Sequence, residues 1–516
     1  MDRAGRFSGD CGGSGGDSGE ITLSSDVASP EPLYYAVTRD GRALVWAGDV
    51  AAVAADPAVD RRLDAAALVE ECVLRFPTGD RTAFAAVRRV PSGGAVRALA
   101  GRDGRLRVTV ASRDPAPAAA AATAVKAAAA TTSPAPTADD RGLDARGLRE
   151  RLLDAVSSAL RGGGAVLLSG GVDSSVLAAL AAQAAPACAG PVFAVTAAGD
   201  DGGAAADRDA ARRVCAAVGL RGVEAAAGGG ASPLDLWAEV VRRTASPQPP
   251  GAAIFQAAEA IRAAAREPGG DGGAGGDGHA APVLLCGEGA DELFAGYFFI
   301  YPHPRLYVDG LKRRLDGLSR SCARAGGDLR RRLAAWDELS SDALFSALYW
   351  MNISERLPSL HLHQARAEAA PTPVAFPYLD RGVAGFALAQ PPRALVSGGV
   401  TKRPLRALVA TLLPGGLGEA IAARPKVGLP EATAGLRAAV TAALGGVEGA
   451  AWAAHPLRWL YADRLALFTA DLFLFTFCVA GGRLPDGFDP RRLYRLFDRD
   501  RAWREAAPDF FSAETG

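Results

Sequence analysis

The sequence predicts an α/β protein built on a doubly wound parallel sheet, with helices toward the C-terminal end. Short apolar runs alternate with stretches of helical pattern, which is typical of strands joined by helical crossovers. The predicted strands lie near 165–168, 191–196 and 282–286, and the predicted helices near 174–184, 205–218 and 291–300. Beyond residue 310 helical patterns dominate, and we expect the helices there to cover the sheet. Nucleotides bind such sheets at the carboxyl ends of strands, where two motifs of this chain are predicted to lie.

The first motif is the run Ser-Gly-Gly-Val-Asp-Ser-Ser, which stands between a predicted strand and a predicted helix. Its glycines let the backbone approach an oxyanion, its serines add hydroxyl donors, and the start of the helix is positive. The run therefore predicts a phosphate-binding turn, formed by Ser169, Gly170, Gly171, Val172, Asp173, Ser174 and Ser175. Asp173 can hold Mg²⁺ beside the phosphates. The residues of this run do not match a lysine-containing P-loop or a Gly-x-Gly-x-x-Gly dinucleotide-binding motif, so both are excluded.

The second motif follows the apolar run 282–286 and places three carboxylates close together between glycines. The carboxylates are Glu288, Asp291 and Glu292, and the glycines are Gly287 and Gly289. Buried carboxylates are unfavourable unless a cation accompanies them, so the motif predicts binding of Mg²⁺–pyrophosphate or of an amine. The alternative is a solvent-exposed acidic turn, which is disfavoured because the first motif is present in the same chain.

Together, the two motifs resemble the synthetase domain of the asparagine synthetase family. The first is similar to the pyrophosphate loop of the N-type ATP pyrophosphatases. That similarity implies an adenine nucleotide α-hydrolase-like fold and cleavage of ATP between its α and β phosphates. The resemblance implies that Asp173 and Asp291 bind Mg²⁺ with the pyrophosphate, and that Gly287 and Gly289 contact the nucleotide. It also implies that Glu288 accepts a proton from the attacking amine, where related β-lactam synthetases have a tyrosine.

Two later segments resemble the same family. The run Pro-Tyr-Leu-Asp at 377–380 is similar to its Pro-Phe-Leu-Asp turn. The segment that begins with Lys402 and ends with the run Arg-Pro-Lys at 424–426 is similar to its late basic segment, in which Lys426 would neutralise charge on the adenylate or pyrophosphate. For Lys402, Arg406 and Arg424, a functional role and an exposed helix face both remain open.

The chain departs from the family pattern just before the turn at 377–380. The family has Glu-x-Arg there, whereas this chain has Pro373 and Ala375. These side chains help to shape the acceptor region, so the departure leaves the identity of the substrate in doubt.

Residues 28–112 resemble the second half of a glutaminase domain, and we interpret them as a small, β-rich, inactive remnant. An Asp-Gly turn between two apolar runs predicts a β-hairpin over 33–47. Glutamine-dependent family members begin with a cysteine nucleophile, which is missing here. Cys11 lies in a predicted disordered tail, 1–27, that has too few apolar residues to pack. We therefore expect the nitrogen to come from free ammonia, from a separate ammonia-supplying partner or from an amine of the substrate.

Two low-complexity segments set the remaining boundaries. Residues 113–142 are rich in Ala, Pro and Thr and predict a flexible linker, and residues 266–281 predict a flexible insertion before the acidic motif. The amide-forming domain is predicted to span 143–505, followed by a short tail at 506–516.

Composition argues against several classes of function. The chain has 57 basic and 57 acidic residues and no long basic stripe, so we expect no nucleic-acid partner. It has no apolar stretch long enough to span a membrane and no signal peptide at its start, so we expect a cytoplasmic location and no membrane partner. The seven cysteines lack the spacing of a disulfide framework or zinc site. His361 and His363 are interpreted as a pair of loop or helix histidines rather than metal ligands.

The sequence thus predicts an ATP- and Mg²⁺-dependent ligase that adenylates a small-molecule carboxylate, with aspartate as the first candidate. It would release pyrophosphate and then transfer ammonia or an amine to the acyl group with release of AMP. One alternative is a macrolactam or β-lactam synthetase-like cyclase that uses an amine of its own substrate. Another is an inactive scaffold that binds nucleotide. The sequence leaves the oligomeric state open, with a homodimer among the options.

Overall fold

The computed structural model describes most of the chain, and the account below concerns those residues only. They are 4–8, 19–111, 145–197, 202–225, 232–249, 251–264, 282–318, 325–425, 434–446, 452, 454–461 and 463–511. The predicted linker 113–142 and the predicted insertion 266–281 lie outside them, as does Cys11. None of the described helices is both long and apolar enough to cross a membrane.

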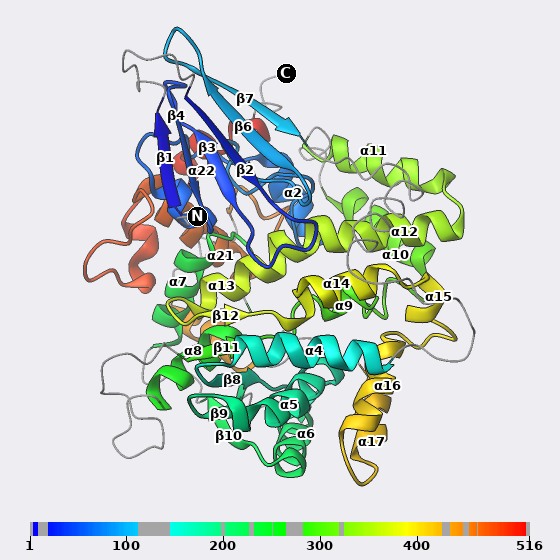
Figure 1. The fold of residues 1–516 in the computed structure, drawn as a ribbon. Coiled ribbons are helices and arrows are strands. Elements are labelled where there is room, and N and C mark those ends of the chain that lie inside the picture. The colour runs from blue at the N-terminus through cyan, green and yellow to red at the C-terminus, as the bar shows by residue number, and fades with distance from the viewer. Residues whose placement is uncertain are drawn as a thin grey trace.

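A five-stranded parallel sheet with helices around it confirms the predicted fold class (Figure 1). Its strands are β8 (Gly164–Leu167), β9 (Val192–Ala197), β10 (Arg221–Ala225), β11 (Val283–Leu285) and β12 (Val374–Ala375). Their order across the sheet is β10-β9-β8-β11-β12. After β8, the chain therefore adds β9 and then β10 on one side of β8 in the sheet. It later adds β11 on the opposite side of β8. Ligands bind such sheets where the direction reverses, which here is between β8 and β11.

The crossover helices cover both faces of this sheet. Because such crossovers are right-handed, the helices that follow β8 and β9 lie on one face, and those that lead to β11 lie on the other. The first face carries α5 (Val172–Ala184) and α6 (Gly202–Val218), with α4 (Ala145–Ala159) against α5; the second carries α8 (Ala253–Ala264), which follows α7 (Pro233–Thr244). Strands covered on both faces consist of apolar runs, and every residue of β8 is buried.

The N-terminal residues form two antiparallel sheets, at the top of the view in Figure 1. One has the order β1-β4-β3-β5 and the other β2-β6-β7. The elements are β1 (Ala4–Ser8), β2 (Glu20–Ser24), β3 (Tyr34–Val37), β4 (Ala43–Ala47), α1 (Val50–Ala55), α2 (Ala65–Leu74), β5 (Val87–Arg89), β6 (Ala95–Ala100) and β7 (Leu106–Ala111). Strands β3 and β4 form the predicted hairpin, and Gly41 in its turn has φ +73°.

The predicted disorder of residues 1–27 is wrong for two segments. Residues 4–8 form β1, which pairs with β4, and residues 20–24 form β2, which pairs with β6. In β2, Leu23 is buried and Ile21 packs against the same small core. Two apolar residues at alternate positions are enough for a strand when an existing sheet offers a free edge.

Helices dominate after β11, as predicted. They are α9 (Ala290–Leu293), α10 (Pro304–Gly317), α11 (Gly327–Ala335), α12 (Ser341–Met351), α13 (His363–Ala369), α14 (Arg381–Leu388), α15 (Pro392–Leu395), α16 (Arg403–Leu412), α17 (Leu417–Ala423), α19 (Ala434–Ala443), α21 (Arg464–Leu474) and α22 (Arg499–Ala506).

Two predicted boundaries are corrected here. The helix expected near 291–300 ends at Leu293, because Ala295 adopts a left-handed conformation with φ 51° and turns the chain. The predicted tail 506–516 is packed in part, since Ala506 and Ala507 are buried and the ring of Phe510 is buried beside that of Trp459.

One helical stretch, residues 341–369, links the N-terminal sheets to the parallel sheet. Its middle is the π-helical segment η4 (Asn352–Leu362), which contains Pro358. Proline cannot donate a backbone hydrogen bond, so the regular helical ladder is interrupted there. At its N-terminal end, the Ser354 carbonyl accepts hydrogen bonds from Arg89 at 3.0 Å and from Ser92 at 2.9 Å. The other end of η4 carries His361.

Candidate active site

The two motifs meet at the carboxyl ends of β8 and β11. These strands are parallel neighbours, with Val166 opposite Leu285, and each motif begins within a few residues of its strand. A Cβ placed on Gly287 would lie 3.5 Å from the Cβ of Asp173, so the two turns are in contact. The sheet topology therefore brings together two segments that are far apart in the sequence.

The turn after β8 has the open backbone that anion binding requires. Gly170 has φ +73°, and a Cβ there would lie 2.6 Å from the Cβ of Ala210, so only glycine fits. Gly171 is the N-cap of α5 and makes no side-chain cap, which leaves the first N–H groups of the helix without a side-chain acceptor. A helix start of this kind favours a phosphate oxygen.

The hydroxyl groups of the turn have different surroundings. Ser174 Oγ accepts a hydrogen bond from the Ser169 amide at 3.2 Å and lies 3.1 Å from Ser169 Oγ. Ser169 is exposed, whereas Ser175 is fully buried and its Oγ has no hydrogen-bond partner among the described residues. Val172 packs in the main core, so its side chain anchors the turn and only its backbone can face a ligand.

Lys402 joins the two turns. Its Nζ lies 2.5 Å from Asp173 Oδ2 and 2.6 Å from Asp291 Oδ1, and its side chain is only 3% exposed. The residue has φ +54° at the start of α16, a conformation uncommon for a non-glycine residue. The sequence left open whether Lys402 has a functional role or lies on an exposed helix face. Its ammonium is buried between two carboxylates, so the exposed helix face is excluded.

Gly296 provides the space for this lysine. A Cβ at Gly296 would overlap Cε of Lys402 and Oδ1 of Asp291. We expect Gly296→Ala to lower the free energy of unfolding by about 1–3 kcal/mol, the usual cost of overpacking. Denaturant unfolding measures the change. Gly385→Ala is the matched control, because a Cβ there meets nothing within 4 Å, and its stability should be unchanged or slightly higher. Equal stabilities of the two variants would contradict this packing.

Glu288 lies beside a second polar cluster, formed with His361, Glu292, Tyr297 and Arg356. His361 Nδ1 lies 3.3 Å from Glu288 Oε2, and His361 Nε2 lies 3.0 Å from the Tyr297 hydroxyl. The Tyr297 hydroxyl also donates to Glu292 Oε1. The Arg356 guanidinium lies 4.3 Å from the centroid of the Tyr297 ring. Glu288 itself is 15% exposed, so it remains open to a small substrate.

The carboxyl group of Glu292 is unusually basic. Burial, with the charge of Asp291 in addition, raises the pKa of Glu292 to about 7. Burial, followed by the charge of Glu292, also raises the pKa of Tyr297 well above its ordinary value. Near neutral pH, Glu292 is therefore only partly ionised, whereas an exposed glutamate would be fully ionised.

The turn at 377–380 supports both motifs. The Tyr378 hydroxyl donates to the backbone carbonyl of Asp173 at 2.9 Å. A Cβ on Gly289 would lie 2.5 Å from a methyl carbon of Leu379, so this glycine, with φ +93°, packs against the turn. The prediction that Gly289 contacts a nucleotide therefore competes with a packing role that the structure supplies.

The late basic segment is described only as far as residue 425, and Lys426 lies outside the described residues. Arg424 forms an ion pair with Asp207. The backbone carbonyl of Asp207 would be 2.8 Å from a Cβ on Gly170, so this pair lies beside the phosphate-type turn. Arg406 donates to the carbonyl of Arg424 at 3.1 Å and so holds the end of this segment in place.

The residues present fit a magnesium ion bound together with a phosphate group. Asp173 and Asp291 offer two carboxylates already grouped around one cation, and Mg²⁺ commonly uses one or two carboxylates with phosphate oxygens and water. Among the described residues, no cluster of three or more His, Cys, Asp or Glu side chains could hold a metal by itself. Asp173 and Asp291 would therefore supply only part of the ligands of a magnesium ion, and a phosphate group would supply others.

Comparison with known families identifies the chain. A family model described as asparagine synthase matches residues 147–447, more than half of the 516 residues. The chain belongs to the asparagine synthase family. The match spans both motifs and the five strands of the parallel sheet, and it confirms the resemblance predicted from the sequence. The family is of the ATP-dependent amidotransferase and ligase type, and it binds ATP. No curated protein matches this chain.

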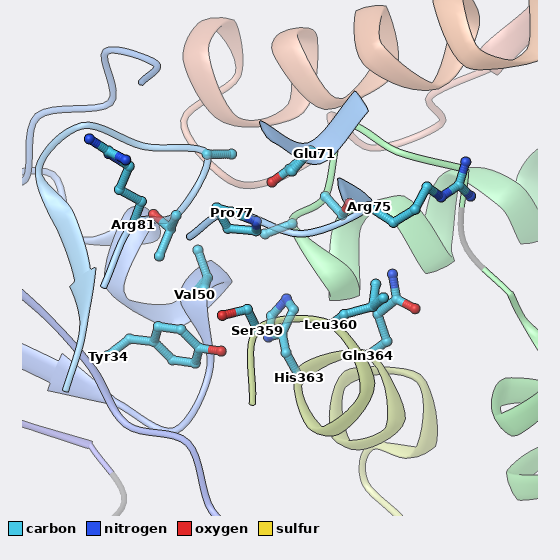
Figure 2. A pocket seen from close by; sticks show the side chains of 14 residues that line it. Tyr34, Val50, Glu71, Arg75, Pro77, Arg81, Ser359, Leu360, His363 and Gln364 are labelled. Atoms are coloured by element: carbon cyan, nitrogen blue, oxygen red, sulfur yellow. The ribbon is translucent and has the colours of Figure 1, made fainter. Parts of the chain in front are cut away.

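A separate pocket of about 30 Å³ lies between the N-terminal residues and the end of η4 (Figure 2). Glu71 points toward it from α2, Tyr34 from β3, and Ser359 and His363 from the helical stretch 341–369. It shares no lining residue with the cluster of Asp173, Asp291 and Lys402.

Glu71 makes the stability of the protein depend on pH. Burial, with the charges of Glu70 and Asp64 in addition, raises its pKa from 4.5 to about 8. Between these values the unfolded chain loses the Glu71 proton while the folded chain keeps it. Glu71 therefore lowers the free energy of unfolding as pH rises through this window, by up to about 1.4 kcal/mol per pH unit.

We expect Glu71→Gln to reduce this loss of stability between about pH 4.5 and 8. Denaturant unfolding at several pH values measures the slope. Glu338→Gln, at an exposed glutamate, is the control and should keep the slope of the parent protein. An unchanged slope in Glu71→Gln would contradict a proton held by buried Glu71.

Proposed function

We propose that this protein is an AMP-forming, ATP-dependent amide ligase of the asparagine synthetase type, with aspartate as the first candidate carboxylate. One observation carries the proposal: Asp173 and Asp291, from two separate turns at the switch point of the sheet, converge on a single buried cation, Lys402. This arrangement is suited to a polyphosphate with its metal.

In the first step, the substrate carboxylate attacks the α-phosphorus of ATP and pyrophosphate leaves. The Ser169–Ser175 turn holds the phosphates through backbone N–H groups at the start of α5, with Ser169 as the exposed hydroxyl. Asp173 and Asp291 would hold Mg²⁺, which neutralises charge on the phosphate oxygens. Alignment and charge neutralisation account for catalysis without a covalent enzyme intermediate.

In the second step, ammonia or an amine attacks the acyl carbon as the bond to AMP breaks. In this proposal Glu288 accepts the proton that the nitrogen loses, and its partial exposure and its position next to the first turn support this role. Lys426 would neutralise the developing charge, in keeping with its position two residues after Arg424, which pairs with Asp207. Residues 28–112 remain, in this proposal, an inactive glutaminase remnant, and the nitrogen comes from another source.

A second candidate is a cyclase that joins an amine and a carboxylate of one substrate. One observation favours it: β12, which ends with Ala375, lies beside β11 at the site, where the family has charged side chains. With Ala375 at the place of the family's arginine, this strand offers less positive charge to a dicarboxylic amino acid. Glu288 in place of a tyrosine favours simple amidation instead.

Exchange of labelled pyrophosphate into ATP tests the proposal. We expect Mg²⁺-dependent exchange with one member of a panel of carboxylates, with aspartate tested first, followed by amide formation when ammonium is added. Exchange only with a peptide or a β-amino acid would replace simple amidation by the cyclase. Absence of exchange with every carboxylate, despite binding of ATP, would identify an inactive scaffold and overturn the proposal.

A further inference from the structure

Arginines from several elements gather around the C-terminal end of α2, outside the proposed active site. Arg75 is the C-cap of α2, and its exposed side chain extends away from the pocket shown in Figure 2. Arg314 of α10 donates from Nη1 to the carbonyl of Val73 at 3.4 Å. The guanidinium of Arg356, in η4, lies 6.0 Å from the centroid of the Phe76 ring. The chain on either side of Arg75 is therefore in contact with a further arginine.

The charges of these arginines act on one another. Although Arg75 is exposed as a whole residue, surrounding atoms bury part of its charge. This burial, followed by the like charges of Arg437 in α19, of Arg314 and of Arg356, lowers the pKa of Arg75. Like charges that are close together repel, so this arrangement is unfavourable unless an anion balances it. The four side chains come from four elements and are not spread along one exposed helix face.

Acidic side chains do not balance this cluster within the ranges that the structure describes. No ion pair there joins any of the four guanidinium groups to a carboxylate. Glu71 is close enough to interact with Arg75, but burial raises the pKa of Glu71 to about 8, so it is mostly uncharged at pH 7. Glu292 interacts with Arg356, and burial raises the pKa of Glu292 to about 7, so it is only partly ionised. The negative end of α2 supplies only about half a charge.

A hydroxyl group lies within the same cluster. Burial raises the pKa of Tyr307, and the charges of Arg356 and Arg314 act in the opposite direction. Tyr307 and Arg314 are two turns apart on α10, which places them on one face of that helix. The ring centroid of Phe299 lies 5.9 Å from that of Tyr307 and 5.9 Å from Cζ of Arg356. In the described part of the chain the Tyr307 hydroxyl has no hydrogen-bond partner, so it can donate to a ligand.

We propose that Arg75, Arg314, Arg356 and Arg437, with the Tyr307 hydroxyl, bind a phosphate-type anion. The planar fork of a guanidinium group matches two phosphate oxygens, and a phosphate with two or more negative charges balances several arginines better than a single carboxylate. Inorganic phosphate, pyrophosphate and the phosphate of AMP all offer this chemistry. The site joins α2, from the N-terminal part, to helices that follow the acidic motif. It is separate from the two turns of the proposed active site, and the inference goes beyond the proposed function.

Isothermal titration calorimetry with inorganic phosphate, pyrophosphate and AMP tests the site, in EDTA without Mg²⁺ and at constant ionic strength. We expect saturable binding of one anion per chain, and the probe that binds most tightly identifies the source. Arg75→Met should weaken this binding by about 10-fold or more, since a hydrogen bond to a charged group is lost. Arg437→Met should weaken it in the same way and serves as the second variant if Arg75→Met fails to fold.

The matched control is Arg313→Met, at the exposed arginine next to Arg314 on α10. It removes the same charge from the same helix, and its binding should equal that of the parent protein. Binding that is equal in the parent protein and in Arg75→Met, or weakened as much in Arg313→Met, overturns the proposal.

Stability without added anion separates a binding site from a structural role. In a chloride buffer, we expect Arg75→Met to be at least as stable as the parent protein, because it removes repulsion between like charges. The anion found by calorimetry should raise the denaturant midpoint of the parent protein but not that of Arg75→Met, because only the parent protein binds it tightly. A lower midpoint of Arg75→Met in chloride, with the same response to the anion as the parent protein, overturns the proposal in favour of a structural role.

The outcomes also distinguish this site from the proposed active site. Binding that is lost in Asp173→Asn and kept in Arg75→Met would assign the anion to the proposed active site and overturn this inference. Absence of pyrophosphate exchange overturns the proposed function, and the titrations of Arg75→Met and Arg313→Met still decide the anion site.

Discussion

Replacement of Asp173 by Asn is expected to lower Mg²⁺-dependent pyrophosphate exchange by about 10²–10³-fold. The substitution keeps the shape of the side chain but removes the charge that, together with Asp291, faces Lys402. Loss of one electrostatic contact to the reacting phosphates has an effect of this size in other enzymes. Initial exchange rates at saturating ATP measure it.

The control for this experiment is Asp342→Asn, at an exposed aspartate in the first turn of α12. Its exchange rate should match that of the parent protein, because it changes the net charge equally but lies in another part of the fold. Exchange that survives Asp173→Asn unchanged would place the ATP site elsewhere.

Replacement of Lys402 by Met is expected to destabilise the protein by about 3–5 kcal/mol in a buffer with EDTA. The variant leaves two mostly buried carboxylates facing each other, with 14% and 16% exposure, and no cation between them. Removing one partner of a buried ion pair has a cost of this order. Mg²⁺ should recover part of the loss, because it binds the folded form and neutralises the same charges. Denaturant unfolding with and without Mg²⁺ measures both effects.

Lys312→Met is the matched control, since Lys312 pairs with Asp337 at a more exposed position. A surface pair contributes at most about 1 kcal/mol, and Mg²⁺ should not alter the control variant. Stability of Lys402→Met that equals that of the control and does not respond to Mg²⁺ would contradict a shared cation site.

The sequence predicts the parts of the site that follow directly from strands. Asp173 and Asp291 belong to short motifs whose glycines and flanking apolar runs indicate a turn at the end of a strand. The parallel sheet then brings them together, because β8 and β11 are neighbours in register. The glutaminase-like character of residues 28–112 stays a prediction, although the hairpin expected within them is present.

Lys402 and His361 could not be assigned from local patterns. Lys402 begins the segment that resembles the family's late basic segment, but nothing local separates a functional role from an exposed helix face, and the space left by Gly296 is what admits its side chain between the carboxylates. His361 lies in a π-helical segment, where ordinary helical spacing does not tell which way a side chain points. Gly296, which follows Glu292 after three residues, was the available signal of a close approach.

A crystal structure with Mg²⁺ and a non-hydrolysable ATP analogue tests the central claim most directly. We predict that the phosphates lie on the Ser169–Ser175 turn, with Mg²⁺ bound by Asp173 and Asp291 and with the α-phosphate facing Glu288. The ammonium of Lys402 should then contact phosphate oxygens or be displaced from between the carboxylates. A nucleotide bound in the pocket near Glu71 and His363, or anywhere away from the two turns, would contradict the assignment.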